Sequence, residues 1–247
     1  ENKDLLVDFT GSDWCGWCIK LVDEVFKHDA FKKGVADKFI LVELDFPKDK
    51  TKVDEATQKQ NAELQEKYGV QGFPTILLLD SKGRPFAQTG YQAGGPEKYL
   101  THLDELRAKG VERDEALAAA EKLEGVEKAK ALVKALDTVP EDHVSHYSDI
   151  TEQVAKLDPE DVTGFVATQK RKDAQTVLEK AVMSDMRAGK GEDAIAKIDK
   201  FIADYKVEGE EKQALLGMKM NPLLGAKKFD EATKVIDELI AAAPETR

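Results

Sequence analysis

Two cysteines, Cys15 and Cys18, are the residues of this chain best suited to chemistry, and the sequence contains no others. A structural disulfide framework spreads its cysteines so that each bridge closes a long loop. A bridge within this pair would close a short loop and constrain the unfolded chain very little. A close pair of thiols can instead exchange electrons with other disulfides, because one thiolate attacks and the other releases the mixed disulfide. The pair therefore predicts redox chemistry.

The two cysteines stand where a strand pattern gives way to a helix pattern. Residues 5–9 form a short apolar run typical of a buried strand, and apolar residues recur at helical spacing after Cys18. A thiolate at a helix N-terminus is stabilised by free backbone N–H groups and by the helix dipole, which lowers the thiol pKa. We expect Cys15 to attack and Cys18, one turn inside, to resolve the mixed disulfide. Gly16 permits the tight turn, and Trp17 lies between the cysteines.

Two other interpretations of the pair are open. A zinc site would need two further ligands, and their plausible source is His143 and His146. These histidines are about 125 residues away from the cysteines in the sequence and do not have the short spacing of a zinc finger. The cysteines could also be buried and inert. Redox chemistry is the leading interpretation, and it requires no cofactor because the cysteine pair carries both electrons.

Strand and helix patterns alternate in the first part of the chain. The charged stretch 53–68 predicts a surface helix, and Pro96 opens a helix that we expect to end near residue 108. Together these patterns predict a small α/β sandwich over residues 1–108. The expected strands are residues 5–9, 39–44, 75–79 and 85–89.

Beyond Lys109 and Gly110 the strand patterns vanish, and Ala, Glu, Lys and Leu dominate with helical periodicity. Residues 194–202 are echoed by residues 232–240, 38 positions later. We interpret residues 111–247 as an all-helical domain of stacked hairpins that loosely resembles tetratricopeptide units. An irregular helical bundle is the alternative.

Composition narrows the function classes. The formal charge of −11 argues against nucleic acid, because a phosphate-binding surface needs clustered Lys and Arg. Stretches of about 20 consecutive apolar residues, which a bilayer span requires, do not occur in the sequence. The remaining classes are soluble enzymes and proteins that bind other proteins.

The tripeptide Phe73-Pro74-Thr75 precedes the third expected strand. A cis proline here would hold the loop against the dithiol and expose backbone groups to an extended substrate strand. A trans proline that merely starts an edge strand is the alternative. The first interpretation makes Phe73, Pro74 and Thr75 candidate substrate-binding residues.

Three segments together resemble the thioredoxin superfamily: residues 7–9, residues 14–18 (Trp-Cys-Gly-Trp-Cys) and residues 68–75. The stretch 9–15 is most similar to bacterial thioredoxin-like proteins of the cell-envelope thiol–disulfide interchange group. The resemblance covers residues 4–108, and its motifs occur in the order of the family. It implies a βαβ–ββα core, a nucleophilic Cys15, a resolving Cys18 and a cis bond before Pro74.

The resemblance also implies a proton-transfer role for Asp8, which matches the buried carboxylate of the family. A carboxyl buried in an apolar strand has a raised pKa, which suits a proton acceptor; a solvated carboxylate at a strand edge is the alternative. The lysine that usually accompanies this carboxylate is replaced by Glu43 or an apolar neighbour. Trp14 is expected to pack beside the dithiol. By the resemblance, the first strand of this chain corresponds to the second strand of the family, so we expect the opening strand and helix of the family to be absent from it.

These observations predict a protein disulfide oxidoreductase of undetermined direction. Its expected partners are protein thiols and disulfides and a redox partner protein, with a protein-binding surface on the helical domain. The rival interpretation is an interaction protein in which the helical domain carries the function and the dithiol is incidental. The resemblance places the protein in the periplasm or cell envelope, and the cytoplasm is the alternative.

Overall fold

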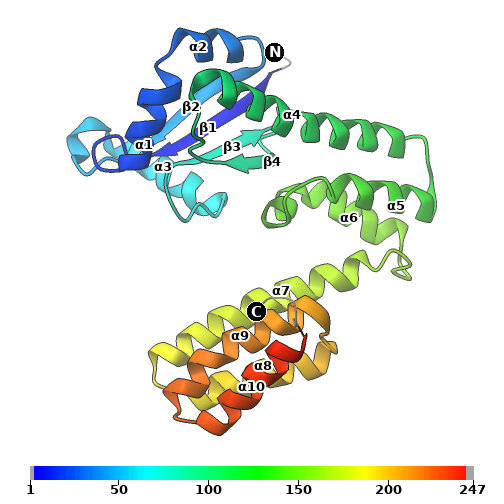
Figure 1. Ribbon diagram of the computed structural model, residues 1–247. Coiled ribbons are helices and arrows are strands. Elements are labelled where there is room, and N and C mark those ends of the chain that lie inside the picture. The colour runs from blue at the N-terminus through cyan, green and yellow to red at the C-terminus, as the bar shows by residue number, and fades with distance from the viewer. Residues whose placement is uncertain (1–2, 243–247) are drawn as a thin grey trace. The chain divides into compact units, whose positions relative to one another are not determined.

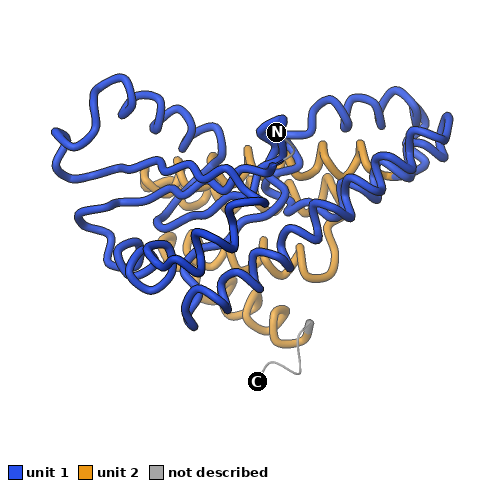
Figure 2. The backbone as a smooth tube through the Cα atoms, turned by 90° about the horizontal axis from the view of Figure 1, so that it is seen from above, with its two compact units in different colours: residues 1–163 blue, residues 164–247 orange. Residues whose placement is uncertain are grey.

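A computed structural model describes residues 3–242 of the chain. The chain divides into two compact units, Glu1–Thr163 and Gly164–Arg247 (Figure 2). The domain boundary expected between residues 108 and 111 stays a prediction. No helix within residues 3–242 has the combined length and hydrophobicity that a bilayer span requires.

The first unit contains a mixed four-stranded sheet in the order β2-β1-β3-β4. Strand β1 pairs parallel with β2 and antiparallel with β3, and β4 pairs antiparallel with β3. The register places Asp8 opposite Glu43 on β2 and opposite Ile76 on β3. All four expected strands are confirmed within one or two residues. They are β1 (Asp4–Thr10), β2 (Phe39–Asp45), β3 (Thr75–Leu79) and β4 (Pro85–Thr89).

Helices cover both faces of this sheet (Figure 1). One face packs against α1 (Gly16–Leu21), the π-helix η1 (Val22–Phe26), α2 (Asp29–Val35) and α4 (Gly95–Ala120). The other face packs against the end of α3 (Glu55–Lys67) and the residues that follow it, beyond the short η2 (Lys50–Lys52). Side chains alternate between the two faces along a strand. Leu6 and Asp8 therefore share the face of α1, and Val7 and Phe9 point to the face of α3.

Helix α4 corrects one expectation from the sequence. We expected it to end near residue 108, but it continues to Ala120 without a break. Gly110 lies inside the helix and does not terminate it. A Cβ atom at this position would lie 2.9 Å from the ring of Phe86 on β4, so a larger residue would not fit there without a shift of that ring. The glycine therefore allows α4 to pass close to the sheet, and the next turn carries Arg113 into a buried position.

The first unit continues with helices that pack on one another in chain order. They are α5 (Gly125–Leu136), the 3-10 helix η3 (Glu141–Tyr147) and α6 (Ser148–Leu157). Tyr147 is fully buried, and its hydroxyl donates to the carbonyl of Pro85 on β4 (3.1 Å). The sheet and these helices thus share a buried hydrogen-bonded contact.

Within residues 164–242 the second unit has four helices, and each packs against the next in the chain. They are α7 (Phe165–Arg187), α8 (Gly191–Tyr205), α9 (Gly209–Gly225) and α10 (Phe229–Ala242). The sequence echo falls on α8 and α10: Ala194 and Ala232 are both buried, whereas Ile198 is buried and Ile236 is 44% exposed. The all-helical region expected over residues 111–247 is confirmed for residues 111–242, and residues 243–247 lie outside the described residues.

Candidate active site

The two cysteines are joined by a disulfide at the start of helix α1. Cys15 is the N-cap residue, and the backbone N–H of Cys18 lies 3.2 Å from its sulfur atom and donates to it. Cys15 is 7% exposed and Cys18 only 1% exposed. The order of exposure agrees with the expected roles, because the cysteine at the helix start is the one nearer to solvent.

The segment before Cys15 is folded into a tight turn. The backbone N–H groups of Trp14 and Cys15 both donate to the carbonyl of Gly11. A Cβ atom at Gly11 would lie 2.7 Å from the indole of Trp14, so a larger residue at position 11 would displace that ring. This turn sets the position of Cys15 relative to the end of β1.

The loop after β2 holds this turn in place through polar contacts. Ser12 donates to Asp45 from both its backbone N–H (2.9 Å) and its hydroxyl (2.6 Å). The carboxylate of Asp13 accepts from the backbone N–H groups of Lys48 (2.8 Å) and Asp49 (3.0 Å). The hydrogen bond from the backbone of Asp49, and next that from Lys48, lower the pKa of Asp13 to about 2. Asp13 therefore stays ionised, and the loop stays attached, throughout the neutral pH range.

Trp14 and Phe73 meet beside the disulfide-bearing turn. The Trp14 indole N–H donates to the carbonyl of Phe46 (2.8 Å), and its ring lies edge-on to Phe73 at 5.9 Å. The Phe73–Pro74 peptide bond is cis, as expected. The hydroxyl of Thr75 donates to the carbonyl of Gly72 (2.8 Å), on the other side of the proline. Trp14 is 42% exposed, so part of its ring remains open to a partner.

A second aromatic pair contains a residue that the sequence analysis missed. Trp17 is 58% exposed, and its ring lies 5.2 Å from that of Tyr91, in the loop between β4 and α4. The Lys20 ammonium lies 4.9 Å from the Tyr91 ring centroid and 5.2 Å from that of Trp17. The Tyr91 hydroxyl donates to Glu24 (2.5 Å). A tyrosine in a glycine-rich loop after a strand was the one signal available in the sequence.

Asp8 is buried, which removes the alternative of a solvated strand-edge carboxylate. It is 6% exposed, and among the residues that the structure describes its Oδ1 atom has no hydrogen-bond partner. Burial raises its pKa to about 7, and the negative charges of Glu43 and Asp45 add to this. Asp8 lies on the sheet face covered by α1, and the interactions of its carboxyl are electrostatic, with Glu43, Asp45 and Tyr99.

The two histidines of the zinc interpretation lie in η3, on the side of the sheet opposite to α1. The ring of His146 packs against Tyr68 at 5.2 Å and against His143 at 6.1 Å. Within residues 3–242, no three His, Cys, Asp or Glu side chains gather closely enough to hold a metal ion.

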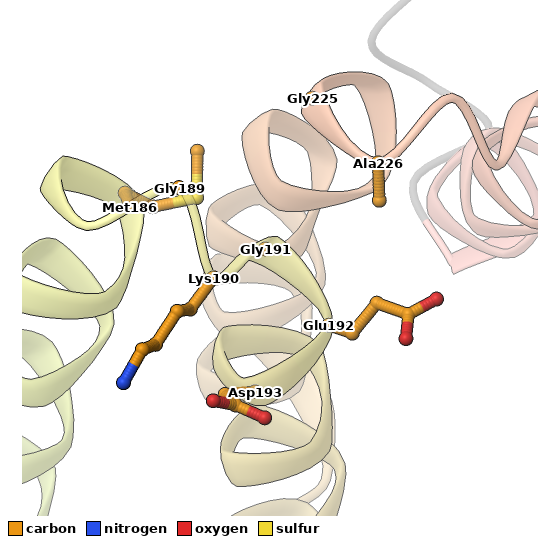
Figure 3. Close-up of a pocket in the computed structure, with 8 residues that line it drawn as sticks. All are labelled: Met186, Gly189, Lys190, Gly191, Glu192, Asp193, Gly225 and Ala226. Carbon is orange, nitrogen blue, oxygen red and sulfur yellow. The ribbon is translucent and has the colours of Figure 1, made fainter.

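A cavity of about 540 Å³ in the second unit is a separate feature (Figure 3). It lies between the turn joining α7 to α8 and the end of α9, and glycines form much of its lining. Lys190 and Glu192 extend in different directions from it, and Glu192 pairs with Lys228 (3.5 Å). The sequence has no cysteine after Cys18, so the residues that line this cavity supply no thiol.

Known proteins match the first part of this chain. A family model of the thioredoxin-like domain matches residues 1–107. The disulfide bond reductase DsbH of Chlamydia pneumoniae is 38% identical over 103 residues, which are 42% of this chain and 61% of that protein. The thioredoxin-related protein DsbJ of the same organism is 37% identical over 86 residues, which are 35% of this chain and 24% of that protein. The chain thus spans less than two thirds of either relative.

A solved structure titled DsbH oxidoreductase is 34% identical, with a TM-score of 0.41, and the match covers 42% of this chain and 72% of that one. The residues that the family model matches contain the four-stranded sheet, the disulfide and the cis proline. Residues 1–107 are therefore a thioredoxin-like domain.

Proposed function

We propose that this protein is a thiol–disulfide oxidoreductase that acts on disulfides of other proteins. The observation that carries the proposal is the Cys15–Cys18 disulfide at the start of α1, with the less buried sulfur at the helix N-cap. The similarity to a protein named disulfide bond reductase supports the same reaction class. The direction of electron flow is left open, and a measured reduction potential of the dithiol decides it: a strongly negative value favours a reductase.

In the reducing direction, the reaction begins with both cysteines as thiols. Cys15 loses its proton, and its thiolate attacks one sulfur of a substrate disulfide. A bond forms between Cys15 and that sulfur, the substrate bond breaks, and the departing substrate sulfur takes up a proton. Cys18 then transfers its proton to Asp8 and attacks the sulfur of Cys15. The Cys15–Cys18 disulfide forms and the second substrate sulfur leaves as a thiolate, which takes up a proton from solvent, so the substrate has gained two electrons and two protons. Oxidation follows the reverse order.

The substrate is proposed to bind as an extended strand across the loops around Cys15. Trp14 and Trp17 offer exposed aromatic surface on two sides of the motif, and Gly16 between them carries no side chain that could block approach. The loop of Phe73, Pro74 and Thr75 offers backbone groups that can pair with such a strand. This arrangement suits protein substrates, because most of the contacts would be with backbone atoms.

The helical region is proposed to hold a substrate or a redox partner protein, because the absence of cysteines after Cys18 rules out an internal electron relay. The similarity to envelope thiol–disulfide interchange proteins favours the periplasm or another envelope compartment over the cytoplasm. The second candidate function is an interaction protein whose helical region does the work while the dithiol is incidental.

Reduction of insulin by dithiothreitol tests the proposal. The full chain should accelerate the reaction, and Cys15→Ser should return the rate to that of dithiothreitol alone, because no nucleophile is left at the helix start. Cys18→Ser should instead accumulate a mixed disulfide through Cys15, visible as a mass increase that dithiothreitol reverses. Equal activity of the parent and Cys15→Ser would establish the interaction protein instead.

Tyr91→Ala is expected to lower kcat/KM for insulin roughly 2- to 10-fold, because an aromatic contact is worth about 0.5–1.5 kcal/mol. The substitution removes the ring that packs against Trp17 and leaves the cysteines untouched. Tyr91→Phe keeps this ring and should stay close to the parent. Tyr205→Ala, at a 40% exposed tyrosine of the second unit, is the matched control. A fall as large in Tyr205→Ala would contradict a specific role for Tyr91.

A further inference from the structure

Asp8 lies beside a cavity that opens on the β2 side of the sheet. The cavity has a volume of about 220 Å³ and is mostly apolar. Its acidic lining residues are the buried Asp8 and the exposed Glu43, and Lys32 of α2 lines it as well. Asp8, whose Oδ1 atom is buried without a hydrogen-bond partner among the described residues, therefore lines the same cavity as the exposed Glu43.

Strand pairing fixes the relation between these two carboxyl groups. Asp8 and Glu43 are direct partners in the parallel β1–β2 pair, so their side chains project from the same face of the sheet. Neighbouring strands lie about 5 Å apart in the pairing direction, which brings two acidic side chains close together at one register position. Two like charges in this arrangement disfavour the ionised form of the more buried group.

The other groups around Asp8 come from every element packed against it. On β2 these are Glu43 and Asp45, on α4 the hydroxyl of Tyr99, and on α2 the ammonium of Lys32. Phe26 and Phe31 contribute apolar surface to the cavity, and the β3 partner of Asp8 is Ile76. Cys18 is buried on α1, which covers this same face, and becomes titratable when the disulfide is reduced. Among these charged residues, Glu43 is the one that lies directly opposite Asp8 in the strand pairing.

We propose that Glu43 is a positioning residue that acts through Asp8: directly opposite Asp8 in the β1–β2 pair and on the lining of the same cavity, its carboxylate controls the transfer of protons to and from Asp8. The inference rests on the proposed oxidoreductase function. When the disulfide opens, protonated Asp8 donates its proton to the Cys18 thiolate. When the disulfide forms, ionised Asp8 accepts the proton of the Cys18 thiol. Solvent water in the cavity then restores the protonation state of Asp8. Glu43 thereby adds to the effect of burial on the pH at which Asp8 can serve both directions.

The test follows the ionisation of Asp8 directly in the full chain. Its carboxyl is titrated by ¹³C NMR or by difference infrared spectroscopy, with Asp8→Asn used to assign the signal. Glu43→Gln should move the titration midpoint of Asp8 to lower pH by about half a pH unit or more, and Glu43→Lys should move it further. Glu43→Asp keeps the charge and should restore most of the parental midpoint. Leu41→Gln changes a 50% exposed residue of the same strand and cavity without adding charge, and should leave the midpoint in place.

The activity arm measures kcat/KM for insulin reduction against pH in the same variants. In Glu43→Gln the limb of the profile that reports Asp8 should move to lower pH by the same amount as the spectroscopic midpoint. An unchanged midpoint in Glu43→Gln, or a midpoint that moves without the rate profile, would overturn the inference. The spectroscopic arm needs no turnover, so it decides the coupling of Glu43 to Asp8 even if insulin is not reduced. In that case it is the proposed function that fails.

Discussion

Arg113→Ala is expected to lower the free energy of unfolding of the first unit by about 3 kcal/mol or more, because it removes a buried charged side chain from a hydrogen-bonded network. Arg113 is 2% exposed, and its Nη1 atom donates to the Tyr147 hydroxyl (2.7 Å) and lies 3.7 Å from the carboxylate of Asp80. Its guanidinium also lies 5.1 Å from the ring centroid of Phe86. Alanine would leave a cavity at this position, and the buried Tyr147 hydroxyl and Asp80 carboxylate would each lose a partner.

Urea denaturation followed by tryptophan fluorescence measures this loss. The chain has two tryptophans, Trp14 and Trp17, and both lie in the first unit, so the signal reports that unit alone. Lys109→Ala, at an exposed position of the same helix, is the matched control and should change the stability by less than about 0.5 kcal/mol. Arg113→Met fills most of the volume and should recover part of the loss. A stability change in Arg113→Ala as small as that in Lys109→Ala would refute the role of the buried network.

Asp8→Asn is expected to stabilise the first unit at pH 8 by up to about 4 kcal/mol. The pKa of Asp8 rises from its ordinary value of 3.8 to about 7 on folding. Each pH unit of such a difference corresponds to roughly 1.4 kcal/mol, which gives the upper limit for a difference of about three. Asparagine has a similar shape and does not ionise, so the variant avoids the cost of burying a charge.

The pH dependence gives this prediction its sign. Between pH 4 and pH 7 the folded protein keeps the Asp8 proton, whereas the unfolded chain releases it. The unfolded state therefore binds fewer protons, and the contribution of Asp8 to stability falls as the pH rises through this range. Unfolding free energies of the parent and Asp8→Asn should nearly coincide near pH 4 and separate up to pH 7, with a constant gap above that. A gap that does not depend on pH would show that Asp8 is not the group that titrates.

The strands could be predicted from the sequence because their apolar runs are short and bounded by Gly, Pro or Asp. The end of α4 could not be predicted. In the sequence alone, Gly110 indicates the end of a helix, since glycine is unfavourable inside a helix. Its actual role is to let α4 approach the ring of Phe86, which is 24 residues earlier in the chain. Such a close approach is a tertiary contact that local patterns do not contain.

The candidate site was predictable where its residues form a linear motif. Cys15, Cys18 and Pro74 belong to such motifs, and the structure places the cysteines in one disulfide and the proline after a cis bond. Tyr91 and Lys20 were missed because their association with Trp17 depends on how the loop after β4 folds back over α1. Asp13 was missed for a similar reason: its partners are backbone N–H groups 35 and 36 residues away, which any residue type can supply.

The continuity of α4 matters to anyone who wishes to produce the redox part of this chain separately. A truncation at residue 108 would follow the change in amino-acid composition, but it would sever a helix that extends to Ala120 and uncover the side of Phe86 that Gly110 and Arg113 protect. A truncation between Leu157 and Phe165 would fall between two helices and preserve the hydrogen bond from the Tyr147 hydroxyl to the carbonyl of Pro85. The shortest soluble fragment should therefore include α5 and α6.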